Sequence, residues 1–145
     1  MSNPNPDQAL VEQLKRHEGF RPHVYLCTAG KQTVGYGRNL EDTGLSENEA
    51  ELLLVNDIQC AKRNLIAKVP IMPQLSWVRQ NVLINMAVNM GMTRLLGFKN
   101  MLDALWRGDF ERAADEMLNS KWADQVGDRA TELAQQMRDN ALQRG

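Results

Sequence analysis

The sequence predicts an α+β fold, in which a small N-terminal β-sheet lobe is joined by a long helix to a helical C-terminal lobe. Three observations predict it: short β-type runs near the N-terminus, one long helical pattern after them, and helical spacing throughout the second half. We expect a single domain over 1–145, with the N-terminal lobe at about 1–45, the connecting helix at about 46–69 and the helical lobe at about 70–145.

The N-terminal lobe is expected to begin with a helix from about Gln8 to Glu18. Asp7 is a favourable N-cap residue, and Gly19 is the glycine that commonly follows a helix C-terminus. The apolar residues of this helix recur at helical spacing and are expected to form its buried stripe: Leu10, Val11 and Leu14. The chain then changes to strand character, with Val24-Tyr25 and Thr33 to Gly37 as short strands around a turn at Ala29-Gly30-Lys31.

The connecting helix is predicted from about Glu47 to Lys68. Ser46 and Glu49 form a capping-box pattern before a long apolar-periodic run, and prolines at 70 and 73 end it. The helical lobe should contain Trp77–Met90, then Leu95–Trp106 split or bent near Gly97, then Phe110–Leu118, a link containing Trp122, and Asp128–Leu142. The inward face of the last helix is expected to be Ala130, Leu133, Ala134 and Met137.

Composition excludes several classes of protein. The net charge is −1, so strong attraction to nucleic acid is not expected. Residues 1–60 carry −4 and residues 61–145 carry +3, which fits either two solvated surfaces or a cleft between lobes of opposite sign. No stretch reaches 18 apolar residues, and Met1 to Leu10 lacks a secretory signal, so neither membrane insertion nor an encoded export signal is expected.

Three residues around the predicted hairpin could carry chemistry. Glu18 stands at a helix C-terminus, where the dipole favours the protonated form of a carboxyl group that an acid catalyst needs. Cys27 and Thr33 bracket the turn, although singly each is also an ordinary small core or strand residue. Both cysteines, Cys27 and Cys60, are expected to be free thiols. The two histidines, His17 and His23, fit no common metal pattern, which leaves a Cys–His nucleophile pair as a minor alternative.

A set of motifs resembles the phage-type lysozymes, glycoside hydrolase family 24. The run from His17 to Tyr25 fits the family pattern E-G-x-R-x-x-x-Y, and residues 33–37 fit T-x-G-x-G. The Glu–Asp–Thr spacing of the family matches Glu18, Cys27 and Thr33 without a gap, with Cys27 in place of the commoner Asp. Weaker similarities continue along the chain, so that the resemblance covers about residues 8–140.

The resemblance implies a role for each of these residues. Glu18 would protonate the glycosidic oxygen, Cys27 would occupy the position of the second carboxylate, and Thr33 would hold the attacking water. Arg129 matches the arginine that pairs with the catalytic Glu in the family. Arg38 departs from the pattern, because the family often has His after G-x-G. Neither a metal nor a cofactor is implied.

The implied function is a muramidase, or endolysin, that hydrolyses the β-1,4 linkage between N-acetylmuramic acid and N-acetylglucosamine in bacterial peptidoglycan and so lyses the host cell. Inversion at the anomeric carbon is favoured, with retention through a covalent glycosyl-thiol as the alternative. A non-catalytic peptidoglycan-binding module and a protein that disrupts membranes through its C-terminal helix remain as competing functions. We expect a monomer that waits in the host cytoplasm until it is released to the cell wall, or that travels in a virion.

Overall fold

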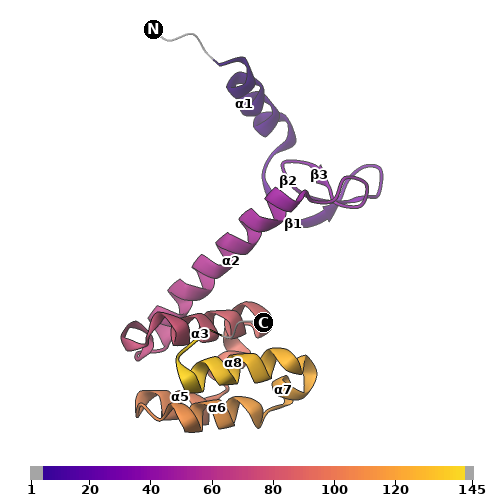
Figure 1. Ribbon diagram of the computed structural model, residues 1–145. Coiled ribbons are helices and arrows are strands. Elements are labelled where there is room, and N and C mark those ends of the chain that lie inside the picture. Colours follow the sequence, from indigo (N-terminus) through magenta and orange to yellow (C-terminus); the bar gives the residue numbers. More distant parts are fainter. Residues whose placement is uncertain (1–4, 143–145) are drawn as a thin grey trace. The chain divides into compact units, whose positions relative to one another are not determined.

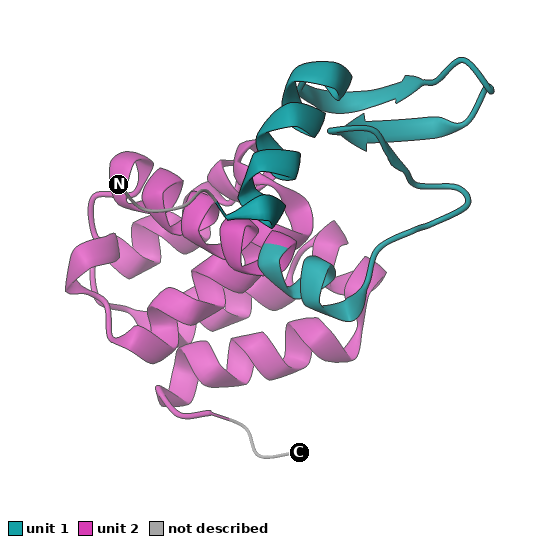
Figure 2. Cartoon of the chain, turned by 90° about the horizontal axis from the view of Figure 1, so that it is seen from above, with its two compact units in different colours: residues 1–52 teal, residues 53–145 magenta. Residues whose placement is uncertain are grey.

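The computed structural model describes residues 5–142 and confirms the α+β class, with helices throughout and one small antiparallel sheet (Figure 1). The chain divides into two compact units, residues 1–52 and 53–145, and the division falls inside the long helix α2, Glu47–Lys68 (Figure 2). Each unit is described by itself below. Across residues 5–142, no helix is both long enough and apolar enough to cross a membrane.

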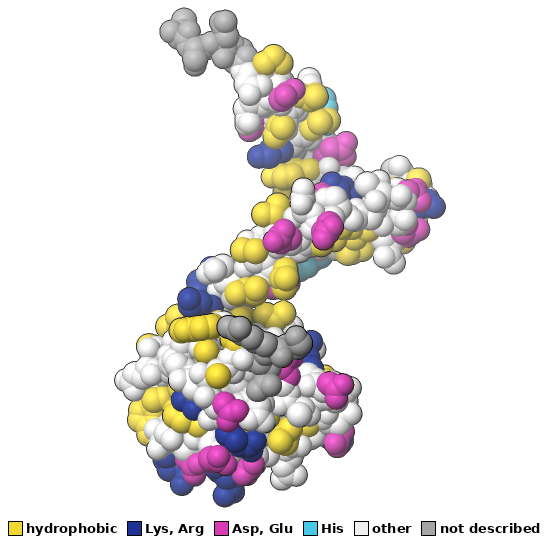
Figure 3. All heavy atoms as spheres, viewed as in Figure 1, with side chains coloured by type: hydrophobic (Ala, Val, Ile, Leu, Met, Phe, Trp, Pro, Cys, Tyr) yellow, Lys and Arg dark blue, Asp and Glu magenta, His cyan; other side chains and the backbone are white. Residues whose placement is uncertain are grey.

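Helix α1, Pro6–Glu18, begins two residues earlier than the sequence predicted. Asn5, not Asp7, is the N-cap: its side-chain oxygen accepts a hydrogen bond from the Asp7 N–H at 2.9 Å, and Pro6 occupies the first turn, where a missing N–H costs nothing. The predicted burial of the apolar stripe was wrong. Leu10, Val11 and Leu14 are 52%, 43% and 44% exposed, because the first unit builds no apolar core around them. Figure 3 shows hydrophobic side chains on the surface of this helix.

The sheet has the order β1-β2-β3, with β1 at Arg21–Leu26, β2 at Gln32–Gly35 and β3 at Arg38–Asn39. All neighbours are antiparallel, and β1 carries an irregularity between Arg21 and Tyr25. Tyr25 stands opposite Thr33, and Thr33 stands opposite Asn39 on the other side. Strand β3 is too short to give a period-2 pattern, so the sequence did not predict it.

The capping box at the start of α2 is formed as predicted. The Ser46 hydroxyl accepts from the Glu49 N–H at 3.1 Å, and the Glu49 carboxylate accepts from the Ser46 N–H at 2.9 Å. The helix keeps its predicted bounds, Glu47–Lys68, and a single 3-10 turn, Met72–Gln74, follows it at the prolines.

The second unit holds the hydrophobic core. Its helices after α2 are α3 (Trp77–Met90), α4 (Met92–Leu96), α5 (Lys99–Trp106), α6 (Phe110–Leu118), α7 (Lys121–Val126) and α8 (Asp128–Asp139). The predicted split near Gly97 separates α4 from α5, and the link expected around Trp122 is the short helix α7, which buries that indole. The predicted inward face of α8 is buried: Ala130, Leu133, Ala134 and Met137.

Candidate active site

Glu18 is the last residue of α1, and the backbone turns sharply after it. Gly19 has φ +71°, a conformation that favours glycine, and its N–H donates to the Lys15 carbonyl at 2.9 Å. The next residue, Phe20, places its ring 5.6 Å from the ring of Tyr36 between centroids. This aromatic pair joins the end of α1 to the turn between β2 and β3, so Glu18 is held beside that turn.

The Glu18 carboxylate lies directly against Gly37. A Cβ atom at position 37 would stand 2.8 Å from Glu18 Oε2 and 3.2 Å from Glu18 Cδ, which is closer than atoms pack. Gly37 also has φ +83°. The residue is therefore glycine for two reasons, the shape of the turn and the space that the carboxylate occupies.

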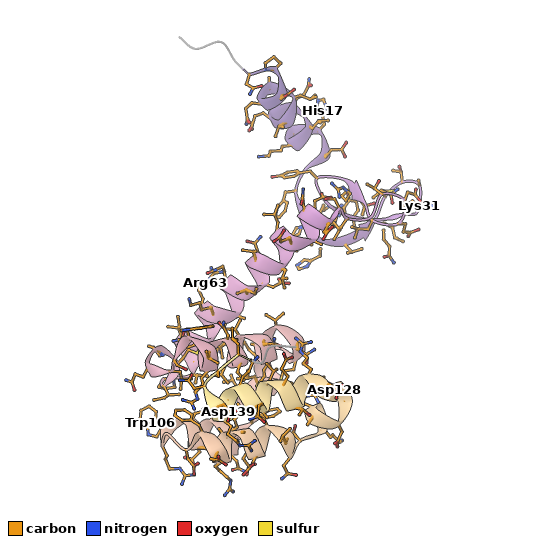
Figure 4. The ribbon with its side chains drawn as sticks, viewed as in Figure 1. His17, Lys31, Arg63, Trp106, Asp128 and Asp139 are labelled. Carbon is orange, nitrogen blue, oxygen red and sulfur yellow. The ribbon has the colours of Figure 1, made fainter. Side chains whose placement is uncertain are left out.

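Cys27 lies at the other end of the hairpin, one residue beyond β1. Its N–H donates to the Lys31 carbonyl at 3.0 Å, and its carbonyl accepts from the Gly30 N–H at 2.8 Å, so the turn closes tightly around it. The Cys27 thiol is free and half-buried, whereas the free thiol of Cys60 belongs to an exposed residue. In Figure 4, Lys31 marks this tip of the hairpin, while His17 lies on α1.

The surroundings of Cys27 favour its thiolate. Hydrogen bonds from the backbone of Lys31, then from the backbone of Ala29 and from the Thr33 hydroxyl, hold the pKa of the Cys27 thiol below its ordinary value. The stabilisation comes from N–H and O–H dipoles of the turn. The Lys31 ammonium group is occupied elsewhere, because it lies 3.5 Å from Asp42 Oδ1 and 4.0 Å from Glu41 Oε2.

Thr33 is the one buried residue among residues 5–60, with 3% of its surface exposed. Its hydroxyl donates to the Lys31 carbonyl at 2.9 Å. Two lone pairs on the hydroxyl oxygen remain to accept hydrogen bonds, including one from a water molecule. The Lys31 carbonyl that this hydroxyl binds also accepts from the Cys27 N–H at 3.0 Å, so Thr33 and Cys27 meet at one backbone oxygen.

The structure thus brings Cys27 and Thr33 together at the Lys31 carbonyl and sets Glu18 against Gly37, four residues after Thr33. No hydrogen bond within residues 5–142 joins either histidine to Cys27, so the alternative Cys–His pair gains no support. The described part of the chain also contains no group of three or more His, Cys, Asp or Glu side chains arranged to hold a metal ion.

Arg129 belongs to the second unit and lies on α8. Its Nε and Nη2 both donate to Asn85 Oδ1, at 3.0 and 2.7 Å. These two residues form the polar part of a groove of about 380 Å³ within that unit, whose other lining residues are Leu54, Ile58, Asn81, Ile84 and Val88. A cation beside apolar side chains is suited to a ligand that carries both acidic and apolar groups.

Comparison with known proteins decides the family. The family model described as Phage lysozyme matches residues 15–140, which include Glu18, Cys27, Thr33 and Arg129. The chain belongs to the phage lysozyme family.

Three relatives of this chain come from two phages and from one cellular organism. The chain is 33% identical over 116 residues to an endolysin of Acyrthosiphon pisum secondary endosymbiont phage 1, covering 76% of this chain and 74% of that protein. It is 26% identical over 154 residues to the probable T4-type lysozyme 1 of Dictyostelium discoideum, covering 86% and 91%. It is 30% identical over 157 residues to the pre-baseplate central spike protein Gp5 of Enterobacteria phage T4, covering 89% of this chain and 27% of the spike protein.

Sequence reasoning missed three residues that contact or adjoin the candidate residues of this phage lysozyme, each within its own unit. Gly37 was recognised as part of a motif but not as the surface under the Glu18 carboxylate. Asn85, whose side-chain oxygen accepts two hydrogen bonds from the Arg129 guanidinium, carries no signal of its own in the sequence. Arg38 was noted as a departure from the family, without a partner, whereas the structure pairs it with Glu49. A bidentate partner for Arg38 could have been sought among the acidic residues at the start of α2.

Proposed function

We propose that this chain is a lysozyme of the muramidase type, which hydrolyses the β-1,4 linkage between N-acetylmuramic acid and N-acetylglucosamine in bacterial peptidoglycan and thereby lyses the host cell. The observation that carries the proposal is that the Cys27 N–H and the Thr33 hydroxyl donate to the same Lys31 carbonyl, on a hairpin whose following turn, at Gly37, lies against the Glu18 carboxylate. Membership of the phage lysozyme family supports the same reaction.

Glu18 is the proposed general acid. In its protonated form it gives a proton to the glycosidic oxygen, so that the bond from that oxygen to the anomeric carbon breaks and the leaving sugar departs as an alcohol. The position of Glu18 at the sharp turn of Gly19, with its carboxylate against Gly37, supports this role.

Cys27 and Thr33 are the residues proposed to act on the attacking water, Cys27 as the base and Thr33 as the group that binds the water. Water donates a hydrogen bond to the Thr33 oxygen and loses its proton to the Cys27 thiolate, while its oxygen forms the new bond to the anomeric carbon. The lowered pKa of the Cys27 thiol supports this role, because it raises the fraction of thiolate near neutral pH. A hydrolysis by this route inverts the anomeric carbon.

The alternative route is direct attack of the Cys27 thiolate on the anomeric carbon, which gives a covalent glycosyl-thiol and net retention. We favour inversion because the family pattern provides Thr33 to hold water; the Lys31 carbonyl shared by the Thr33 hydroxyl and the Cys27 N–H supports this choice. Proton NMR of the product formed in the first minutes of digestion identifies the anomer and decides between the two routes.

The rest of the proposal concerns the setting. Arg129 keeps the supporting role that the family pattern implies, the substrate partner is peptidoglycan, and the chain acts as a monomer. Two relatives suggest two ways to the wall: one is named an endolysin and another a spike protein of a phage. Either an endolysin that waits in the host cytoplasm or a virion-borne enzyme would meet the same polymer.

Digestion of purified peptidoglycan tests the reaction. Mass analysis of the products should show muropeptides with reducing ends, as hydrolysis requires. Anhydro-muropeptides would identify a transglycosylase instead. Binding of the chain to sedimented peptidoglycan without any soluble product would identify a non-catalytic binding module, and release of dye from lipid vesicles would support action on membranes.

A further inference from the structure

An ion pair holds the backbone beside Gly37. Arg38, the first residue of β3, pairs with Val34 of β2 through the backbone. Its guanidinium group donates from Nη1 to Glu49 Oε1 at 2.8 Å and from Nη2 to Glu49 Oε2. Nη1 also donates to the Gly44 carbonyl at 3.1 Å. Arg38 therefore ties the turn that contains Gly37 to both the following loop and the start of α2.

Glu49 is itself held in place on a second side. Its carboxylate accepts from the Ser46 N–H and its own N–H donates to the Ser46 hydroxyl, so the capping box fixes the residue on α2. The hydrogen bond from Arg38, aided by those from Ser46, lowers the pKa of Glu49 to about 2. Both groups of the pair are therefore charged at neutral pH.

We propose that Arg38 and Glu49 are positioning residues for Glu18. The Glu18 carboxylate lies against Gly37, where an added Cβ atom would stand 2.8 Å from Oε2, so a movement of the turn moves the surface beside the acid. The bidentate pair prevents that movement by anchoring the residue after Gly37 to the first turn of a long helix. The inference rests on the proposed function of Glu18 as the acid.

Two other roles of the Arg38–Glu49 pair must be distinguished from positioning. In one the pair does no more than stabilise the fold, and in the other it does no more than cap α2. The chain offers variants that separate them. Arg38→Lys keeps the charge but loses the planar fork that binds both carboxylate oxygens. Glu49→Gln keeps an oxygen for the capping box but loses the ionised partner. Ser46→Ala removes the cap hydroxyl and leaves both charged groups in place.

Initial rates on soluble, uncross-linked peptidoglycan strands test the proposal. Arg38→Lys and Glu49→Gln should lower kcat by about tenfold or more with little change in KM, because a displaced acid affects the chemical step and not binding. Ser46→Ala should lower Tm while kcat below the melting range stays close to that of the wild type. Equal loss of kcat in all three variants, or loss only in proportion to Tm, would overturn the positioning role.

NMR of the Glu18 carboxyl carbon tests the same proposal without requiring enzyme turnover. With 13C-labelled glutamate, the Glu18 carboxyl resonance is assigned by its disappearance in Glu18→Gln. It should move in Arg38→Lys and Glu49→Gln and remain in place in Ser46→Ala. An unmoved resonance in the first two variants refutes the inference. If the resonance moves but the wild-type protein hydrolyses nothing, the proposed function fails while the link from Arg38 to Glu18 stands.

Discussion

The two units of this chain are stabilised in different ways. Among residues 5–142, every buried hydrophobic side chain lies at Ala61 or later, in the second unit. The first unit, which contains Glu18, Cys27 and Thr33, is ordered by backbone hydrogen bonds, glycines with positive φ and the Arg38–Glu49 pair. Hydrophobic burial has no preferred direction, whereas hydrogen bonds depend on direction. In this chain the first unit fixes the directions of the candidate catalytic side chains, and the second unit supplies most of the free energy of folding.

The largest expected effect belongs to the first unit. Glu18→Gln should reduce the hydrolysis of purified peptidoglycan by about a thousandfold and abolish lysis of Gram-negative cells stripped of their outer membrane, because the amide cannot donate the proton. Tm should change little. Glu12→Gln is the matched control, since Glu12 lies on the same exposed helix and bonds only to Gln8. Normal lysis by Glu18→Gln would remove that residue as the acid.

The next prediction concerns the second unit. A substitution in its core should lower the free energy of unfolding and leave catalytic activity nearly unchanged. Leu105 on α5 is 1% exposed, so Leu105→Ala should lower the free energy of unfolding by about 3 kcal/mol through lost burial and a residual cavity. At a temperature well below Tm the variant should keep nearly full activity. Leu118→Ala is the control, because Leu118 is 40% exposed. A large loss of kcat in folded Leu105→Ala would contradict the separation of roles.

Cys27 gives the third effect. Cys27→Ser should lose about a hundredfold in activity, because a hydroxyl group is not ionised at neutral pH, whereas Cys27→Asp should keep much of the activity. The lowered pKa of the Cys27 thiol also predicts rapid alkylation at pH 7. Iodoacetamide should therefore inactivate the wild type and Cys60→Ser at similar rates, with mass spectrometry locating the adduct on Cys27. Full activity in Cys27→Ser would make the thiol a bystander.

The fold was largely predictable from the sequence where local signals are strong. Helices α2, α3 and α6 keep their predicted bounds, because capping residues, prolines and a closing glycine mark their ends. The start of α1 and the two-residue strand β3 were not predicted. Asn5 and Asp7 are both good caps, and a strand of two residues exists only through its partner β2.

The site was predictable in a different way. Glu18, Cys27 and Thr33 were named together through the resemblance of their spacing to a family, since each is unremarkable alone. The contacts that hold them join residues brought close by folding, such as Glu18 with Gly37 and Arg38 with Glu49. No local pattern encodes such a contact, so these supporting residues emerge only from the structure.

A smaller loss of activity is expected from adding a single carbon atom at Gly37, beside the Glu18 carboxylate. Gly37→Ala places a Cβ atom 2.8 Å from Glu18 Oε2 and should lower kcat by about tenfold, because the flexible carboxylate is pushed aside. Gly35→Ala is the matched control: Gly35 has φ +70°, close to the +83° of Gly37, but a Cβ atom there meets nothing within 4 Å. Both variants share a backbone strain of about 1–2 kcal/mol. Equal activity in the two would show that strain alone matters.

The smallest expected effect is a dependence of stability on pH that arises in the first unit. Because the pKa of Glu49 is lowered from 4.5 to about 2, chiefly by Arg38, the folded state binds this proton more weakly than the unfolded chain does. The pair therefore contributes its full stability above about pH 4.5, and the contribution is lost as pH falls toward 2. Tm measured between pH 6 and pH 2.5 should fall less steeply in Glu49→Gln than in the wild type, and less steeply in Arg38→Lys as well. Parallel slopes in all three proteins would mean that Glu49 titrates as an ordinary surface carboxyl, and would weaken the case that directed polar contacts hold the first unit.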